Sequence, residues 1–215
     1  MKKAIISFIG TDGAGKSTII AELKKSLEQE QSIKVKTVYF GWKPFLPTTK
    51  LLSFILKKKN YQIADKMNKP TESKLKKKFS LFQEIMLSYY YVEYLSRYFF
   101  QLKLTSRNSI TLVDRYFYDI YAHYRYAEQS HIFPALLKMM PKPALTVFLS
   151  VEVQTAKQRK PEMDLLLLQE HHQRYQQLCN LITARMVKTD QQLEQSVNEI
   201  LNIIKEKLQK EECKV

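Results

Sequence analysis

Cysteine is scarce in this chain of 215 residues. Only Cys179 and Cys213 occur, they lie far apart, and neither belongs to a CxxC pair. This scarcity excludes a disulfide framework and a cysteine-based zinc site. The four histidines show no metal-ligand spacing with cysteines or acids. We therefore expect a protein of a reducing compartment, the cytoplasm.

Long hydrophobic runs are also missing. No apolar stretch approaches the length of a membrane span, and the short one after Met1-Lys2-Lys3 does not end in a signal-peptide cleavage site. Internal repeats and low-complexity linkers are absent as well. With 45% hydrophobic residues, residues 1–215 suit a single α/β domain with a substantial buried core.

Negative charge is in short supply. Lys and Arg number 35 against 21 Asp and Glu, which gives a formal net charge of +14. The excess predicts attraction to polyanions such as phosphorylated substrates, nucleic acid and anionic lipid heads. Much of it lies in the lysine-rich segments 57–59 and 74–78. A solvated helix face is the simpler interpretation of such segments, and polyanion binding is the alternative.

Glycine is rare too, but its distribution is informative. Three of the four glycines lie in GTDGAGKST, from Gly10 to Thr18, directly after the apolar run Ala4 to Ile9. The stretch matches G-x-x-x-x-G-K-[ST] and opens a segment with helical spacing, Ile19 to Leu27. Strand, glycine loop and helix start together indicate a phosphate-binding loop, and this context disfavours a chance match.

Each part of this loop has a physical role in binding a nucleoside triphosphate. Glycines let successive N–H groups converge on one phosphate, and the positive end of the next helix adds to that field. Lys16 would reach the β- and γ-phosphates, and the Ser17 hydroxyl would ligate Mg²⁺. The expected cofactors are ATP and Mg²⁺. The residues expected to bind the nucleotide are Gly10, Asp12, Gly13, Ala14, Gly15, Lys16, Ser17 and Thr18.

A second strand is predicted over residues 33–40, followed by the turn Gly41-Trp42-Lys43-Pro44. The order strand, helix, strand predicts a parallel sheet, in which ligands gather at the carboxyl ends of the strands. Trp42 and Lys43 would lie at that edge and could touch a second substrate. A cover over the core and a plain surface charge are the alternative roles. Residues 44–70 are expected to form a short helix and a mobile stretch.

A long helical pattern starts at Thr71-Glu72 and continues to about Leu104, with apolar residues at three- and four-residue spacing. Several tyrosines between Tyr89 and Tyr98 make it aromatic on more than one face. Core packing is the default role for such a stripe. Base stacking and a homodimer face are the alternatives.

The second stretch with predicted chemistry is Asp114-Arg115-Tyr116, at the end of the buried strand Ile110 to Val113. An acid at the carboxyl end of a strand beside the phosphate-loop strand can hold Mg²⁺ or accept a proton from an attacking hydroxyl. Arg115 offers a planar fork for phosphate oxygens. A simple Asp-Arg ion pair at the strand end is the alternative.

The rest of the chain continues the alternation. We expect a helix over 116–127, a chain broken by prolines over 131–143, a strand over 144–149, and a helix over 152–160 that ends in Arg159 and Lys160. Residues 157–170 could form a lid over the triphosphate that carries these two cations. A structural turn is the alternative. A helix to about residue 182, a short strand at 186–188 and a helix over 193–208 close the chain.

Together these segments resemble the thymidylate kinase group of P-loop nucleotide kinases. The resemblance rests on the strand leading into GTDGAGKST, the long helix, VDRYFYDIYAHY, and LSVEVQTAKQR before a lid. It covers nearly the whole chain. It implies a P-loop nucleoside triphosphate hydrolase fold, with a five-stranded parallel sheet flanked by helices. It also implies phosphoryl transfer from ATP to an acceptor such as dTMP.

The resemblance further implies roles for single residues. Asp12 would contact the acceptor near its sugar, and Arg115 would grip the acceptor's phosphate. Because Gly13 follows the loop acid, the catalytic cation would come from the lid, with Arg159 the first candidate and Lys160 the second. The implied catalytic residues are Lys16, Asp114, Arg115 and Arg159, and the implied metal ligands are Ser17 and Asp114.

The sequence departs from the family where the acceptor is recognised. Gly41-Trp42-Lys43-Pro44 replaces an arginine-glutamate-proline-glycine-glycine-threonine segment, and the base-reading arginine is missing near residues 82–86. Asp119 and Tyr124 stand where the family has serine and glutamine. The leading hypothesis is an ATP-dependent kinase for a nucleoside monophosphate or another small acceptor, such as a sugar. A nucleotide-switched protein that binds nucleic acid or membrane, and a homologue that holds nucleotide without catalysis, are the other hypotheses.

Overall fold

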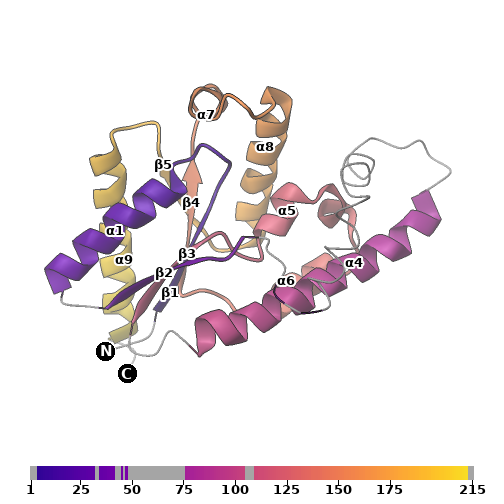
Figure 1. Ribbon diagram of the computed structural model, residues 1–215, viewed down its shortest axis with the longest axis horizontal. Helices are drawn as coiled ribbons and strands as arrows, with labels where there is room; N and C mark the ends of the chain where they lie inside the picture. Colours follow the sequence, from indigo (N-terminus) through magenta and orange to yellow (C-terminus); the bar gives the residue numbers. More distant parts are fainter. Residues whose placement is uncertain are drawn as a thin grey trace.

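One parallel sheet forms the centre of the molecule (Figure 1). The computed structural model describes residues 4–31, 34–41, 45, 47, 76–104 and 109–212. Within these ranges the sheet has five strands in the order β2-β3-β1-β4-β5, which confirms the predicted sheet. The strands are β1 (Ala4–Ile9), β2 (Val35–Tyr39), β3 (Ile110–Asp114), β4 (Leu145–Ser150) and β5 (Arg185–Lys188).

Helices cover both faces of this sheet. They are α1 (Lys16–Gln31), α4 (Lys76–Arg97), α5 (Asp119–His123), α6 (Phe133–Met139), α7 (Val153–Arg159), α8 (Leu165–Leu181) and α9 (Leu193–Glu212). In Figure 1, α1 and α9 lie on one side of the strands, and α4, α5 and α6 lie on the other. None of the helices described is long and apolar enough to cross a membrane.

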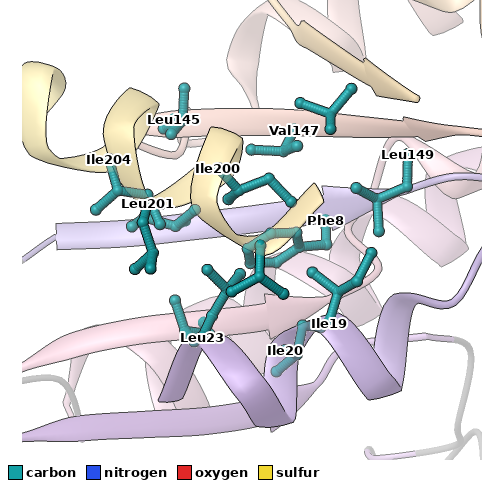
Figure 2. Packing of buried hydrophobic residues seen from close by; sticks show 14 of the residues in the cluster. Phe8, Ile19, Ile20, Leu23, Leu145, Val147, Leu149, Ile200, Leu201 and Ile204 are labelled. Carbon is teal, nitrogen blue, oxygen red and sulfur yellow. The ribbon is translucent and has the colours of Figure 1, made fainter. Parts of the chain in front are cut away.

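The core between the sheet and α1 and α9 is aliphatic except for one aromatic ring. Figure 2 shows Phe8 of β1 beneath α9, with aliphatic side chains of α1 and β4 around it. All six residues of β1 are buried, as expected for a central parallel strand covered on both faces. The apolar stripe of α9 follows helical spacing, with Val197, Ile200, Leu201 and Ile204 buried. The phosphate loop therefore follows a strand that is buried at the centre of the sheet.

The second core, on the α4 side, is aromatic. Tyr94 of α4 is 1% exposed, and its ring lies edge-on to Phe117 with the centroids 5.7 Å apart. Tyr91 and Tyr94 therefore pack into the core, as the default interpretation predicted, whereas Ile85 and Phe99 of the same predicted stripe are exposed. The last turn of the long helical pattern differs from a plain α-helix, because α4 continues into a π-helical segment, η1 (Tyr98–Lys103).

Two sequence predictions about the chain after β3 were wrong. The single helix expected over 116–127 is divided into α5 and a 3₁₀ helix, η2 (Arg125–Gln129), because Tyr124 is extended. Its ring meets Tyr90 of α4 edge-on at 6.0 Å, a tertiary contact that local spacing cannot reveal. The proline-rich segment after it contains α6. Pro134 fits there because it lies in the first turn, where its missing N–H is not needed.

Several predictions concern residues outside the described ranges. These are the turn residues Trp42 and Lys43, the segment 48–75 with the lysines at 57–59, and the start of the long helix. Residues 76–78 belong to α4, but their side chains are not among those described. The proposed roles of these lysines and of Trp42 stay predictions.

Candidate functional site

The register of the sheet brings the two predicted stretches together. Phe8 pairs with Asp114 across β1 and β3, and Ile9 pairs with Phe148 across β1 and β4. The phosphate loop and the Asp114-Arg115 pair therefore leave the same edge of the sheet from neighbouring strands. The site described below lies at this edge.

The phosphate loop needs glycine for steric reasons. Gly10 has φ +151°, and a Cβ on it would lie 2.5 Å from the carbonyl oxygen of Leu149 in β4. Gly13 has φ +85°, and its Cβ would lie 2.8 Å from the carbonyl oxygen of Ala156 in α7. Any larger residue would push the loop away from β4 or α7. The loop is thus packed between two elements that come much later in the chain.

Lys16 is folded back onto this loop. Its Nζ donates hydrogen bonds to the carbonyl oxygens of Gly10 and Thr11, both at 2.8 Å, and the residue is buried. Burial, together with the positive charge of Arg115, lowers the pKa of Lys16 to about 8. An anion bound in the loop would compensate this buried charge.

A side-chain hydrogen bond links Ser17 and Asp114 at this edge of the sheet. The Ser17 hydroxyl donates to Oδ2 of Asp114 at 3.1 Å. The other oxygen, Oδ1, is buried and has no hydrogen-bond partner among the described residues. Burial raises the pKa of Asp114 above its ordinary value. A hydroxyl and a carboxylate with an unsatisfied oxygen are the hard donors that Mg²⁺ prefers, so these residues fit the metal ion that accompanies a nucleotide.

Arg115 lies at the centre of a polar cluster. Its guanidinium donates to Asp119 at 2.7 Å and to Asp12, and it lies 2.8 Å from Nε2 of His123. Although burial alone would lower the pKa of Arg115, the charge of Asp119 outweighs it and raises the pKa. The backbone of Arg115 is also unusual, since φ is +71°. Its N–H donates to the carbonyl oxygen of Phe8 at 2.9 Å, which fixes the residue against β1.

Sequence reasoning did not assign a function to Asp119 or His123. Asp119 is buried, and its Oδ1 accepts a hydrogen bond from the Tyr175 hydroxyl of α8 at 2.9 Å. Burial and the charge of Arg115 lower the pKa of His123 to about 4, which keeps its imidazole neutral. The four-residue separation of Arg115 and Asp119 is a signal that could have predicted their ion pair. Nothing local could have predicted Tyr175.

A cavity of about 360 Å³ lies beside Arg115. It is lined by Tyr39, Tyr90, Tyr94, Arg115, Asp119, Ile120, His123 and Tyr124. Its size is at the low end for small-molecule sites. A larger cavity of about 710 Å³ borders the first residues of β4 and β5, so it lies at the opposite edge of the sheet from the phosphate loop.

One wall of the smaller cavity is held by a buried arginine that the sequence did not single out. Arg97 of α4 is 2% exposed and donates to the carbonyl oxygens of Gly41 at 2.7 Å and Tyr39 at 3.2 Å. Its guanidinium also covers the ring of Phe40, 4.6 Å from the centroid. Arg97 therefore fixes the end of β2, from which Tyr39 contributes to the cavity.

Of the two lid cations, one reaches the phosphate loop. Arg159 donates to the carbonyl oxygen of Gly13 at 3.2 Å and to that of Thr189 at 3.0 Å. Lys160 instead pairs with Glu162 at 3.5 Å on the surface. The turn after α7 is closed by Lys157, which donates to the carbonyl oxygens of Pro161 and Met163 at 2.7 and 2.6 Å. Whether residues 157–170 act as a lid stays a prediction.

These features define the fold. A parallel sheet whose first strand runs through a glycine loop into α1, with Asp114 at the end of the neighbouring strand, is the P-loop nucleoside triphosphate hydrolase fold. More narrowly, it is the thymidylate kinase-like form of that fold. The structure is similar to that of thymidylate kinase from Ehrlichia chaffeensis, with a TM-score of 0.60 and 15% sequence identity over 95% of this chain and 100% of that chain. No family model and no curated protein sequence matches the chain.

Proposed function

We propose that the protein transfers the γ-phosphoryl group of ATP to a small acceptor, either a nucleoside monophosphate or a related molecule. The observation that carries this proposal is the Ser17–Asp114 hydrogen bond of 3.1 Å across β1 and β3. It supports a magnesium site next to the glycine loop, because a hydroxyl and a carboxylate are donors that Mg²⁺ prefers. The cavity of about 360 Å³ next to Arg115 gives the acceptor a place at the same edge of the sheet.

Each residue contributes by position and charge. Backbone N–H groups of the loop and the start of α1 bind phosphate oxygens, and Lys16 turns from the Gly10 and Thr11 carbonyls to the β- and γ-phosphates. Ser17 and Asp114 hold the Mg²⁺, which neutralises phosphate charge when bound. Arg159 adds a positive charge beside Gly13, where charge develops during transfer.

A coupled assay for ADP formation tests this function. The assay supplies ATP and Mg²⁺ with a panel of nucleoside monophosphates, nucleosides and sugars. We expect acceptor-dependent ADP formation that Lys16→Met abolishes. The surface variant Lys25→Met should keep it, because Lys25 pairs with Glu22 on the surface of α1. If none of the acceptors in the panel supports ADP formation, the proposal is refuted. Activity unchanged in Lys16→Met would refute the role of the loop.

A further inference from the structure

The polar cluster at the wall of the 360 Å³ cavity carries an inference about the acceptor. Arg115 is the side chain that would grip a phosphate on the acceptor, if the acceptor had one. Both ends of its guanidinium fork are already bound to carboxylates, Asp119 at 2.7 Å and Asp12 on the phosphate loop. The guanidinium of Arg115 therefore forms ion pairs with two carboxylates of the protein itself.

This cluster is packed in place. The side chain of Arg115 is 14% exposed and that of Asp119 is 6% exposed. Both oxygens of Asp119 are used, one by Arg115 and the other by Tyr175, which is itself fully buried. A Cβ on Gly41 would lie 2.7 Å from Cδ of Arg115, so the chain after β2 closes over the arginine stem. The guanidinium has little room to turn away from its carboxylates.

The charge of the cluster follows from these contacts. Among the described residues that line the cavity or touch Arg115, the side chains in ion pairs are Arg115, Asp119 and Asp12. Burial and the charge of Arg115 lower the pKa of His123 to about 4, so its imidazole adds no charge near pH 7. Within this set, one guanidinium is shared by two carboxylates. The next cation, Lys16, donates to the carbonyl oxygens of Gly10 and Thr11 and not to the cavity. A phosphate monoester placed here would face two carboxylates and a guanidinium that is already paired, whereas an uncharged hydroxyl can donate a hydrogen bond to Asp12.

We propose that the acceptor is a nucleoside and not a nucleoside monophosphate, with its hydroxyl held at the cluster of Asp12, Arg115 and Asp119. This proposal rests on the phosphotransferase function proposed above. The tyrosines that line the cavity, Tyr39, Tyr90, Tyr94 and Tyr124, supply flat aromatic surface for a planar base.

The chemical step is balanced without any further reactant. The nucleoside hydroxyl oxygen attacks the γ-phosphorus of ATP, and a new P–O bond forms. The bond from that phosphorus to the β,γ-bridging oxygen breaks, and ADP leaves with the electron pair. The hydroxyl proton passes to Asp12 of the phosphate loop, whose side chain is 31% exposed and pairs with Arg115. Asp119 instead positions Arg115, because both of its oxygens are engaged.

Equilibrium binding of paired ligands tests the proposal. Thymidine, deoxycytidine, deoxyadenosine and deoxyguanosine are each compared with their 5′-monophosphates by isothermal titration calorimetry, in the absence of ATP. We expect at least one nucleoside to bind about tenfold or more tightly than its monophosphate, because like charges disfavour the latter. Equal or tighter binding of the monophosphates, or no binding of any nucleoside, would overturn the proposal.

A variant locates the preference at Asp119. Asp119→Asn removes one negative charge at nearly constant size and should shift the ratio of nucleoside to monophosphate affinity about tenfold toward the monophosphate. Glu170→Gln removes the same charge on α8, where Glu170 pairs with Arg125 and Arg174, and should leave the ratio unchanged. A ratio that moves equally in both variants would assign the effect to net charge and overturn the role of Asp119. If Asp119→Asn does not fold, the wild-type comparison decides.

The proposed function is tested separately. Binding of ATP with Mg²⁺, measured without an acceptor and compared with Lys16→Met, reports on the phosphate loop alone. If ATP binds and monophosphates are the better acceptors, the inference about the acceptor fails while the phosphotransferase function stands. If ATP does not bind, the function fails whatever the nucleoside titrations show.

Discussion

Ser17 and Asp114 lie 97 positions apart in the sequence and are joined by a hydrogen bond of 3.1 Å. One residue begins the helix after the phosphate loop, and the other ends the neighbouring strand. Oδ1 of Asp114 is buried and has no hydrogen-bond partner among the described residues, and the role of the pair as metal ligands stays a prediction. Magnesium is the ion that suits it.

The first prediction concerns this pair. Ser17→Ala and Asp114→Asn should each raise the Mg²⁺ concentration needed for half-maximal ADP formation, by about 10–100-fold, because each removes an oxygen that holds or orients the ion. Ser26→Ala is the control, since Ser26 lies on the same helix and its hydroxyl donates to the carbonyl oxygen of Glu22. An unchanged Mg²⁺ requirement in both site variants would contradict the assignment.

The second prediction distinguishes the roles of Arg159, at the end of α7, and Lys160, which follows it. Arg159→Gln should lower kcat by about 10³-fold, as expected for an arginine that stabilises phosphoryl transfer. Lys160→Gln should have little effect, because Lys160 pairs with Glu162 away from the loop. Steady-state kinetics with saturating ATP distinguish the two. A larger loss in Lys160→Gln would contradict the choice of Arg159 as the catalytic cation.

The third prediction uses two glycines with similar backbone angles. Gly13 and Gly15 have φ +85° and +77°, so an alanine at either site should cost about 1–2 kcal/mol of unfolding free energy through backbone strain alone. At Gly13 the Cβ would also meet the carbonyl oxygen of Ala156 at 2.8 Å, whereas at Gly15 the nearest atom is 3.9 Å away. Gly13→Ala should therefore lose about 1–3 kcal/mol more, measured by denaturant unfolding. Equal losses would show that α7 moves freely against the loop.

The fourth prediction is a pH dependence of stability. Burial, with a further contribution from His123, lowers the pKa of His171 to about 4, against 6.5 in the unfolded chain. The unfolded state binds the proton first as pH falls, so this residue favours folding fully above pH 6.5 and loses that contribution between pH 6.5 and 4. Between pH 7 and 4.5 the loss is about 2 kcal/mol.

The variant His171→Phe tests that pH dependence. It keeps an aromatic ring beside His123, whose ring centroid lies 4.4 Å from that of His171, but it removes the titrating group. Its unfolding free energy should fall by about 2 kcal/mol less than that of the wild type over the same pH range. Parallel curves for the two proteins would contradict the assignment.

The elements that the sequence predicted well are those with local signatures. The glycine loop is fixed by spacing within nine residues, Gly10 to Thr18, and the buried strands are fixed by continuous apolar runs such as Ala4–Ile9. The position of Asp114 beside the loop also followed from sequence, since the carboxyl ends of parallel strands share one edge. The roles of Lys16, Asp114, Arg115 and Arg159 in catalysis stay predictions.

Other features depended on contacts between distant segments. The helix breaks at Tyr124, whose ring contacts that of Tyr90. The buried Asp119 accepts a hydrogen bond from Tyr175 of α8. Arg97 binds the end of β2 from a helix more than fifty residues later in the chain. Local spacing carries no information about such pairs, because each partner alone is compatible with several environments. The amino-acid sequence by itself predicted a phosphate-binding loop at Gly10 to Thr18, because its glycine and lysine spacing is local. Only the tertiary structure decided that Arg115 is neutralised by two carboxylates, since that depends on which side chains the packed core brings within hydrogen-bond distance.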